Sequence, residues 1–462
     1  MKKTIRKYIG DKAFYKMVLA IAMPIMIQNG FTNFVGLLDN IMVGRVGTEQ
    51  MSGVAIANQL LLVFNITIFG AVSGASIYGA QYYGLGDKKG VRDTFRFKLI
   101  ISGILTVLAV IIFSGAGEPL IALYLNEGDG ARELGATLQY GRSYLNVMMI
   151  GLLPYATAQS YASTLRDTGQ TRLPMLAGIA AVIVNLFLNY LLIFGKFGAP
   201  ELGVTGAAIA TVVSRFVELA IILCAVHGQR KITDIIDGTY KNFRVPAVLV
   251  KKIAITGTPL LINEALWSMG MAVMNQCYSV RGLDVVAAVN ICSTVANLFN
   301  VVFLSLGSCI AIVVGQQLGA GETEKAVDTD RKLIVFSVAS CLLIGGMLAA
   351  LSGLFPMIYN TEPQVRKIAS SLIFVNACCM PIQAFNHASY FTMRSGGKTF
   401  ITFLFDSVFV WVVNIPLAYI LAHFTVITIV PLYLCCLLVD FMKCVVGFIL
   451  LKRRTWVKNI VA

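Results

Sequence analysis

The second half of this chain repeats the first, and that duplication limits its possible folds more than any other feature. A shift of roughly 235 positions superimposes matching residues along both halves: Pro24 on Pro259, Asn40 on Asn275, Gln81 on Gln316, Gly84 on Gly319 and Gly86 on Gly321. A repeat of fixed period over half the chain indicates that one structural unit was built twice and that the copies pack against each other.

The composition identifies the solvent around this fold. Of the 462 residues, 57% are hydrophobic and 13% are charged, whereas an average soluble domain carries about 25% charged residues. Apolar runs long enough to cross a bilayer recur twelve times, at 17–43, 52–80, 97–116, 143–164, 173–195, 203–227, 250–278, 286–314, 332–354, 368–392, 399–422 and 425–451. We therefore predict an all-α integral membrane protein with twelve transmembrane helices in two pseudo-symmetric six-helix bundles.

The charges predict the topology. Lys and Arg concentrate in the two tails and in alternate loops, which places both termini in the cytoplasm of a multi-pass protein of the cell (inner) membrane. The most polar internal stretch, His227–Lys252, divides the repeats. We predict an N-terminal lobe at 1–227, a cytoplasmic linker at 228–249 and a C-terminal lobe at 250–462. Such a linker would let the lobes rock for alternating access.

Several classes of function are disfavoured. The net charge of +14 follows the predicted topology, so it does not indicate nucleic-acid binding, and the ten cysteines fall in predicted spans. No complete Gly-x-x-x-x-Gly-Lys-Ser/Thr phosphate loop is present. An intramembrane enzyme would need paired aspartates or a His-rich metal set, and we find neither. We expect a monomer in contact with membrane lipids, with no enzymatic activity and no cofactor.

Acids at membrane depth carry the functional information, because each is costly unless it faces protein or water. Asp39 ends a polar stripe that includes Gln28 and Thr32 on the first helix. The stripe predicts that this face points inward. The alternative is that Asp39 caps a neighbouring loop at the helix end.

Glu264 in the seventh span is followed on one face by Trp267 and Met271. A carboxylate beside an indole and a flexible thioether favours recognition of an organic cation. The alternative is a protonated glutamic acid that bonds structurally between helices.

The remaining intramembrane charges fall into two groups. Two pairs of opposite charge are spaced i, i+3 at corresponding places in the repeats: Arg215 with Glu218, and Asp440 with Lys443. We interpret both as structural ion pairs. Asp406 and His387 have no evident local partner. His387 suits either proton relay or packing.

Several long motifs, in order, resemble the multidrug and toxic compound extrusion (MATE) family. They are Pro24-x-x-x-Gln28, DNIMVGRVG, GAQYYGLGD, LRDTGQTRLP and NLFLNYLLIFGKFGAPELGVTGAAIAT. The resemblance covers nearly the whole chain. It implies a secondary active antiporter whose two lobes form a V-shaped central cavity and which exports organic cations or drugs in exchange for inward H⁺ or Na⁺.

The resemblance also implies site residues. Asp39 matches the family's coupling acid, with Asn185 and Thr211 as polar neighbours, and Asn189 stands where one branch has a second aspartate. These four would bind the coupling cation, with Asp39 a ligand of Na⁺. Glu264 resembles the helix 7 acid of another branch, about one turn nearer the helix proline, and Gln383 or Asn386 replaces that branch's helix 10 aspartate.

For the substrate cavity we predict seven residues: Gln28, Glu264, Trp267, Met271, Gln383, Asn386 and His387. Two other functions stay open. One is a flippase for a lipid-linked oligosaccharide or lipid from the same superfamily, which would favour a cationic cavity, and the other is an exporter of an endogenous metabolite.

Overall fold

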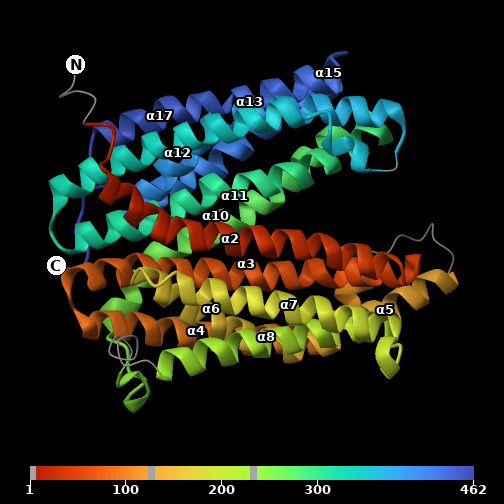
Figure 1. The fold of residues 1–462 in the computed structure, drawn as a ribbon, viewed down its shortest axis with the longest axis horizontal. Coiled ribbons are helices and arrows are strands. Elements are labelled where there is room, and N and C mark those ends of the chain that lie inside the picture. Colours follow the sequence, from red (N-terminus) through yellow and green to blue (C-terminus); the bar gives the residue numbers. More distant parts are fainter. Residues whose placement is uncertain (1–6, 123–130, 229–236, 360) are drawn as a thin grey trace. The chain divides into compact units, whose positions relative to one another are not determined.

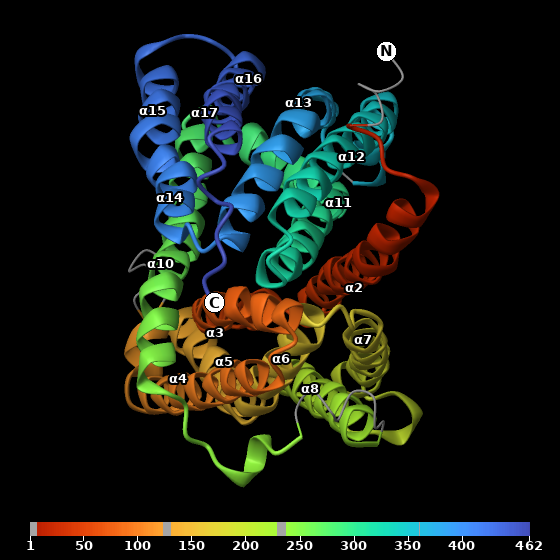
Figure 2. The ribbon, with the colours of Figure 1, turned by 90° about the vertical axis from the view of Figure 1, so that its left-hand side faces the viewer.

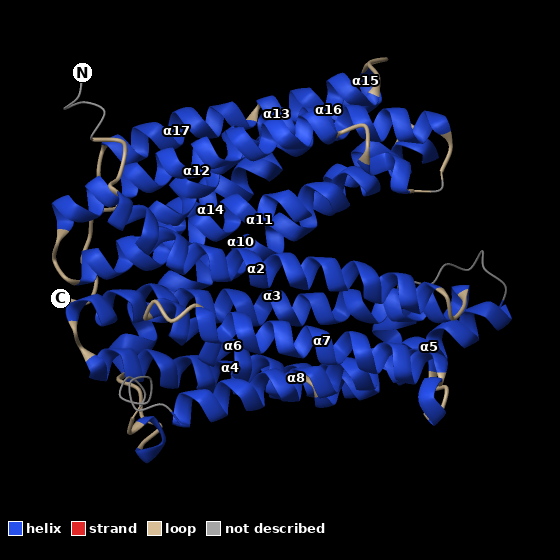
Figure 3. Ribbon diagram, viewed as in Figure 1, coloured by secondary structure: helices blue, strands red, loops and turns tan. Residues whose placement is uncertain are grey.

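The computed structural model describes residues 7–122, 131–228, 237–359 and 361–462, and every regular element in these ranges is helical (Figures 1 and 3). The first repeat contains α2 (Lys12–Gly44), α3 (Thr48–Leu85), α4 (Lys88–Ala122), α5 (Ala131–Ile150), α6 (Leu152–Asp167), α7 (Arg172–Phe194) and α8 (Gly203–Gly228). The second contains α10 (Ala247–Ser279), α11 (Leu283–Gly319), α12 (Thr323–Leu351), α13 (Pro363–Ser395), α14 (Thr399–Phe403), α15 (Ile415–Phe424), α16 (Ile429–Leu438) and α17 (Asp440–Lys452).

These helices confirm a multi-pass membrane fold. Among the described residues, ten segments are long and apolar enough to span a bilayer. The two predicted spans outside that set have local causes. Asn263 and Glu264 interrupt the apolar sequence of α10, and the chain breaks between α5 and α6 at Gly151. A side chain at Gly151 would lie 3.1 Å from Val212 and 3.2 Å from Arg215, so α8 packs directly against this break.

The chain divides into two compact units. One, here called the N-lobe, comprises Ile27–Gly79 and Lys88–Ala254; the other, the C-lobe, comprises Met1–Met26, Ala80–Asp87 and Ile255–Ala462. In the N-lobe α8 packs against α5, α6 and α7, and in the C-lobe α11, α12 and α13 lie side by side (Figure 2). Both α2 and α3 contribute to both units. The division of α2 falls near its internal proline, Pro24.

Within the C-lobe, the end of α3 crosses the end of α11 through a reciprocal contact. A Cβ atom on Gly84 would collide with the backbone carbonyl of Gln316, and one on Gly319 would collide with the carbonyl of Gln81. The two glycines and the two glutamines are each 235 positions apart. Only glycine permits so close an approach of the two backbones.

The C-terminal segment secures the same crossing. The fully buried Gln81 side chain donates to the carbonyls of Ser395 at 2.9 Å and Lys458 at 3.2 Å, and accepts from the Ile460 amide at 2.9 Å. Trp456, in the same C-terminal segment, is buried in the C-lobe core. The last residues are thereby fixed to α3 and α13.

Candidate cation site and its surroundings

The four residues predicted to bind the coupling cation lie together in the N-lobe. Asn185 and Asn189 are four residues apart and therefore share one face of α7. Asn189 Nδ2 donates to Asp39 Oδ1 on α2 at 2.7 Å, and also lies 3.2 Å from Asn185 Oδ1. Thr211 Oγ1, on α8, is 3.2 Å from the Asn185 amide. Three helices thus meet around one carboxylate.

Two amide groups surround the Asp39 carboxylate. Turned by 180°, the Asn185 amide donates to both Asp39 oxygens at 3.1 Å and accepts from Thr211 at 3.2 Å. Asn189 is 1% exposed, and no donor among the described residues reaches its Oδ1. A buried amide oxygen without a donor is costly, and a bound cation would satisfy it.

The donor set suits Na⁺. Hard, weakly polarising cations take carboxylate, amide and hydroxyl oxygens, and Asp39, Asn189, Asn185 and Thr211 supply all three kinds. One carboxylate among neutral groups balances one positive charge. The residues that would hold Na⁺ are therefore these four, and the same carboxylate can exchange a proton instead.

Gln28, expected in the substrate cavity, is engaged within the N-lobe. Its Oε1 accepts a hydrogen bond from Arg166 Nη2 of α6 at 3.0 Å. A Cβ atom on Gly178 of α7 would lie 2.9 Å from Gln28 Nε2, so the side chain rests close against that helix. Its role in the cavity stays a prediction.

On α10 the predicted cation-recognition residues follow one face. Glu264 is half-buried, while Trp267 and Met271 are 41% and 42% exposed. Arg394 and Asp406 lie within electrostatic range of the Glu264 carboxyl. The aromatic and thioether groups are therefore accessible beside the acid, as organic-cation recognition requires.

The predicted residues of α13 are placed differently. Asn386 is buried and its Nδ2 donates to the Asp440 carbonyl at 3.0 Å, while its Oδ1 lies 3.2 Å from Cys444 Sγ, so it fastens α13 to α17. The His387 ring packs 4.8 Å from that of Phe303. Gln383 is partly exposed, and among the described residues it makes no comparable packing contact or hydrogen bond. We retain Gln383 and omit the other two from the proposed substrate site.

The structure shows the partners of the charged residues in the two lobes. Asp406 is not isolated, because Lys443 Nζ lies 3.4 Å from its Oδ1 and Asn263 donates to its Oδ2 at 3.2 Å. The Asp440 to Lys443 pair is present at 3.7 Å. Arg215 lies within electrostatic range of Glu218, donates to the Gly151 carbonyl at 3.3 Å and lies over the Tyr155 ring at 4.9 Å. Its guanidinium therefore contacts both the break before α6 and an aromatic ring of that helix.

One buried ion pair carried no local sequence signal. Lys98 of α4 is completely buried and its Nζ donates to Asp167 Oδ2 of α6 at 2.6 Å, to Ser163 Oγ at 2.9 Å and to Thr164 Oγ1 at 3.4 Å. The partners lie more than 60 residues away along the chain. From the sequence, a lysine near the start of an apolar run is expected at the membrane surface. Only the fold shows that the Lys98 side chain points into the protein interior.

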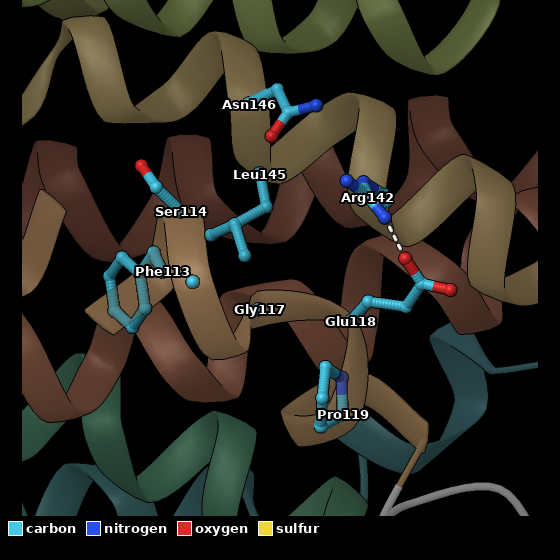
Figure 4. A pocket seen from close by; sticks show the side chains of 9 residues that line it. Phe113, Ser114, Gly117, Glu118, Pro119, Arg142, Leu145 and Asn146 are labelled. Atoms are coloured by element: carbon cyan, nitrogen blue, oxygen red, sulfur yellow. Dashed lines mark ion pairs between the residues drawn. The ribbon is translucent and has the colours of Figure 1, made fainter. Parts of the chain in front are cut away.

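A shallow pocket lies elsewhere in the N-lobe, between α4 and α5 (Figure 4). Arg142 forms an ion pair with Glu118 in this pocket. The pocket is lined by Phe113, Ser114, Gly117, Glu118, Pro119, Arg142, Leu145 and Asn146. Both charged side chains are about half exposed. None of the predicted site residues lines this pocket.

Comparison with known proteins identifies the family. Residues 24–191, and again residues 259–420, match the MatE family. The "Probable multidrug resistance protein NorM" of Thermotoga maritima is 24% identical over 416 residues, which cover 88% of this chain and 86% of that protein.

Solved structures share the fold. An outward-facing multidrug resistance MATE family transporter of the MOP superfamily superimposes with a TM-score of 0.87 at 20% identity, covering 97% of each chain. A MOP superfamily transporter from Pyrococcus furiosus gives 0.86 at 20% identity, also over 97% of each chain, and the reverse polarity of its binding pocket suggests a different function for it. Because the family model matches in both halves, this chain belongs to the MATE family, whose members are multi-pass membrane transporters and not enzymes.

Proposed function

We propose that this transporter exports organic cations, including drugs, in exchange for inward H⁺ or Na⁺, and that Asp39 binds the coupling ion. The observation that carries the proposal is the N-lobe cluster itself. An intramembrane carboxylate is held by Asn189 at 2.7 Å, next to a buried amide oxygen that has no donor among the described residues. Polar groups this deep are retained where ions pass.

The position of Asp39 supports a coupling role. Its helix, α2, belongs to the C-lobe up to Met26 and to the N-lobe from Ile27. A cation bound to Asp39 neutralises the carboxylate to which Asn185 and Asn189 donate. The hydrogen bonds between α2 and α7 at this point therefore change when the ion binds. A conformational change in α2 affects both units, because each unit contains part of this helix.

Glu264, Trp267, Met271 and Gln383 are proposed to contact the substrate. A carboxylate attracts the positive charge, and an accessible indole adds attraction through its ring quadrupole. Methionine adapts to substrates of different shape. Together these groups suit a range of organic cations, whether drugs or an endogenous metabolite.

A lipid-linked oligosaccharide flippase is the weaker alternative. Pyrophosphate recognition would need free cations, but Lys98 is held by Asp167 and Lys443 lies between Asp406 and Asp440. The acids Asp39 and Glu264 would repel such a substrate.

Dye uptake into inverted membrane vesicles, under separately imposed proton and sodium gradients, tests the proposal. We expect one of the two gradients to drive uptake of a cationic dye into wild-type vesicles, and neither to drive it with Asp39→Asn. Equal gradient-driven transport by the variant would overturn the role of Asp39. Movement of a lipid-linked sugar without dye transport would favour the flippase.

The proposed orientation has both termini and the 228–249 linker in the cytoplasm of the cell membrane. Residues 229–236 of the linker lie outside the described part of the chain. Cysteines introduced at 237–246 should react with an impermeant reagent in inverted vesicles and not in intact cells. Labelling of intact cells would reverse the topology.

A further inference from the structure

A second polar cluster, formed by two partly buried acids and one buried lysine, lies entirely in the C-lobe. Lys443 of α17 places its ammonium 3.4 Å from Asp406 Oδ1 and 3.7 Å from Asp440 Oδ1. The same nitrogen lies 5.1 Å from the centre of the Phe409 ring. With two carboxylates and one ammonium, these three residues carry one excess negative charge inside the membrane, where a net charge is costly.

Two asparagines frame the cluster. Asn263 of α10 donates to Asp406 Oδ2 at 3.2 Å, and its own Oδ1 accepts from the Ser407 hydroxyl at 2.8 Å, so it is fixed. Asn414 Nδ2 donates to Asp440 Oδ1 at 3.2 Å. Asn414 is only 8% exposed, and no donor within the described ranges reaches its Oδ1. The cluster thus contains a buried oxygen that lacks a positively polarised partner.

The backbone is irregular at the same place. Between α14 and α15 the chain forms two π-helical turns, Leu404–Val408 and Val410–Asn414, which carry Asp406 and Asn414. Turns of this kind are rare and often occur at functional sites. Here they bring an acid and an amide to the same cluster from positions eight residues apart.

The salt-bridge geometry is open. The Lys443 contacts of 3.4 and 3.7 Å are longer than a normal charge-assisted hydrogen bond of about 2.7–2.9 Å. The ammonium neutralises only one of the two carboxylates. Glu264 lies within electrostatic range of Asp406 and of Arg394, whose charge is opposite to its own, and His387 lies within electrostatic range of Asp406 and Lys443. One positive charge is therefore missing.

The repeat supplies an independent argument. Asn414 lies 225 positions after Asn189, the same shift that relates Arg215 and Glu218 to Asp440 and Lys443. Both amides donate to an aspartate, and their oxygens remain without a donor among the described residues. The helices involved also correspond, since α2, α7 and α8 build the N-lobe site and α10, the α14–α15 segment and α17 build this one.

We propose that this C-lobe cluster is a second site for one Na⁺ ion, bound by carboxylate oxygens of Asp406 and Asp440 and by the amide oxygen of Asn414, with the Lys443 ammonium as a competing internal cation. Na⁺ supplies the missing positive charge and satisfies the Asn414 oxygen. Lys443 holds the two acids together when the ion has left and weakens binding enough for release.

Binding of ²²Na⁺ to the purified full-length protein at pH 8 tests this inference. The Asp39→Asn background removes the N-lobe acid, so failure of the proposed role of Asp39 and failure of this site give different results. We expect Asp39→Asn to retain one Na⁺ per chain, and adding Asp440→Asn or Asn414→Leu to weaken that binding by about ten- to hundredfold. The exposed acid of the same lobe, Asp328→Asn, is the matched control and should leave it unchanged.

Lys443→Met gives the decisive gain. If the ammonium competes with the ion, its removal should tighten Na⁺ binding by roughly tenfold or more, which a misfolded protein cannot do. Unchanged or weaker binding in a folded Lys443→Met protein overturns the inference. So does Na⁺ binding that survives Asp440→Asn but is lost with Glu264→Gln, and so does the absence of any Na⁺ binding in Asp39→Asn, as for a cluster that takes up only a proton.

Discussion

Each lobe buries a lysine beside an aspartate, and the two arrangements differ in how completely the lysine is satisfied. In the N-lobe, Lys98 has one acid at 2.6 Å and two hydroxyl acceptors. In the C-lobe, Lys443 stands between two acids at longer distances. The first is a closed, neutral contact and the second has room and charge for another ion.

The contrast shows two ways of placing charge in a membrane. The N-lobe separates its functions, because Lys98 and Asp167 join α4 to α6 while Asp39 forms the candidate ion site elsewhere. The C-lobe combines them, because Lys443 both stabilises the helices and, in our proposal, competes at the ion site. Burial alone therefore does not decide whether a lysine has a structural or a functional role. What decides it is whether the acids around the lysine are fully neutralised by it.

Breaking the closed pair should have the largest effect on folding. Lys98→Met leaves Asp167 buried without its cation, which costs about 3–5 kcal/mol of stability. Thermal unfolding of the purified protein should show a large loss for Lys98→Met and a smaller one for Lys443→Met, since its two acids keep amide donors. Equal losses would erase the distinction between the lysines.

Removing the lone N-lobe acid should abolish coupling without unfolding the protein. Asp39→Asn preserves volume and removes the only formal charge of its cluster, so the loss of coupling-ion affinity should be about a hundredfold, or roughly 3 kcal/mol. Drug resistance of cells at equal expression measures it, with Asp328→Asn as the control. Full resistance of the Asp39→Asn strain contradicts the assignment.

The substrate face of α10 should respond to charge and to the indole separately. Trp267→Ala should lower apparent affinity for cationic substrates about five- to thirtyfold, through roughly 1–2 kcal/mol of cation-π and packing energy. Glu264→Gln should reduce efflux of a cationic dye more than that of a matched neutral dye. Equal losses for both dyes would make Glu264 a structural or coupling residue.

The two asparagines with unsatisfied oxygens give a symmetrical test. Asn189→Leu and Asn414→Leu each remove one oxygen ligand, which should weaken Na⁺ binding in the affected lobe by about tenfold. Each variant should leave the other lobe unchanged. For Asn189→Leu this is measured in the Asp39→Asn background, and for Asn414→Leu in the Asp440→Asn background. An effect of either change on both lobes would mean that the sites are not independent.

The exposed pair should matter least. Arg142 and Glu118 are about half exposed, and surface ion pairs contribute about 0–1 kcal/mol. Arg142→Gln should therefore leave dye efflux unchanged and shift thermal stability only slightly. A marked loss of transport would give the pocket of Figure 4 a function that its geometry does not suggest.

The sequence predicted the helices because apolar runs follow directly from the bilayer, and it placed Asp39 with Asn185, Asn189 and Thr211 through the family motifs. The C-lobe cluster was harder to predict. Asp440 and Lys443 are visible as an i, i+3 pair, but Asp406 joins them through two π-helical turns that change which residues share a face. Asn263 reaches the cluster from more than 140 residues away. The partner of Lys98 is likewise set by tertiary packing alone.

The crossing of α3 and α11 also records how such a chain could arise. Gly84 meets Gln316 while Gly319 meets Gln81, so each half gives the other the contact it receives. Two identical half-length chains would meet in this way in a symmetric homodimer. In such a homodimer, one substitution of this glycine would change the interface at two places, because each chain would carry it. In a fused chain the two glycines stay fixed by this contact, while other positions of each copy can change independently, so the two lobes can carry different charges.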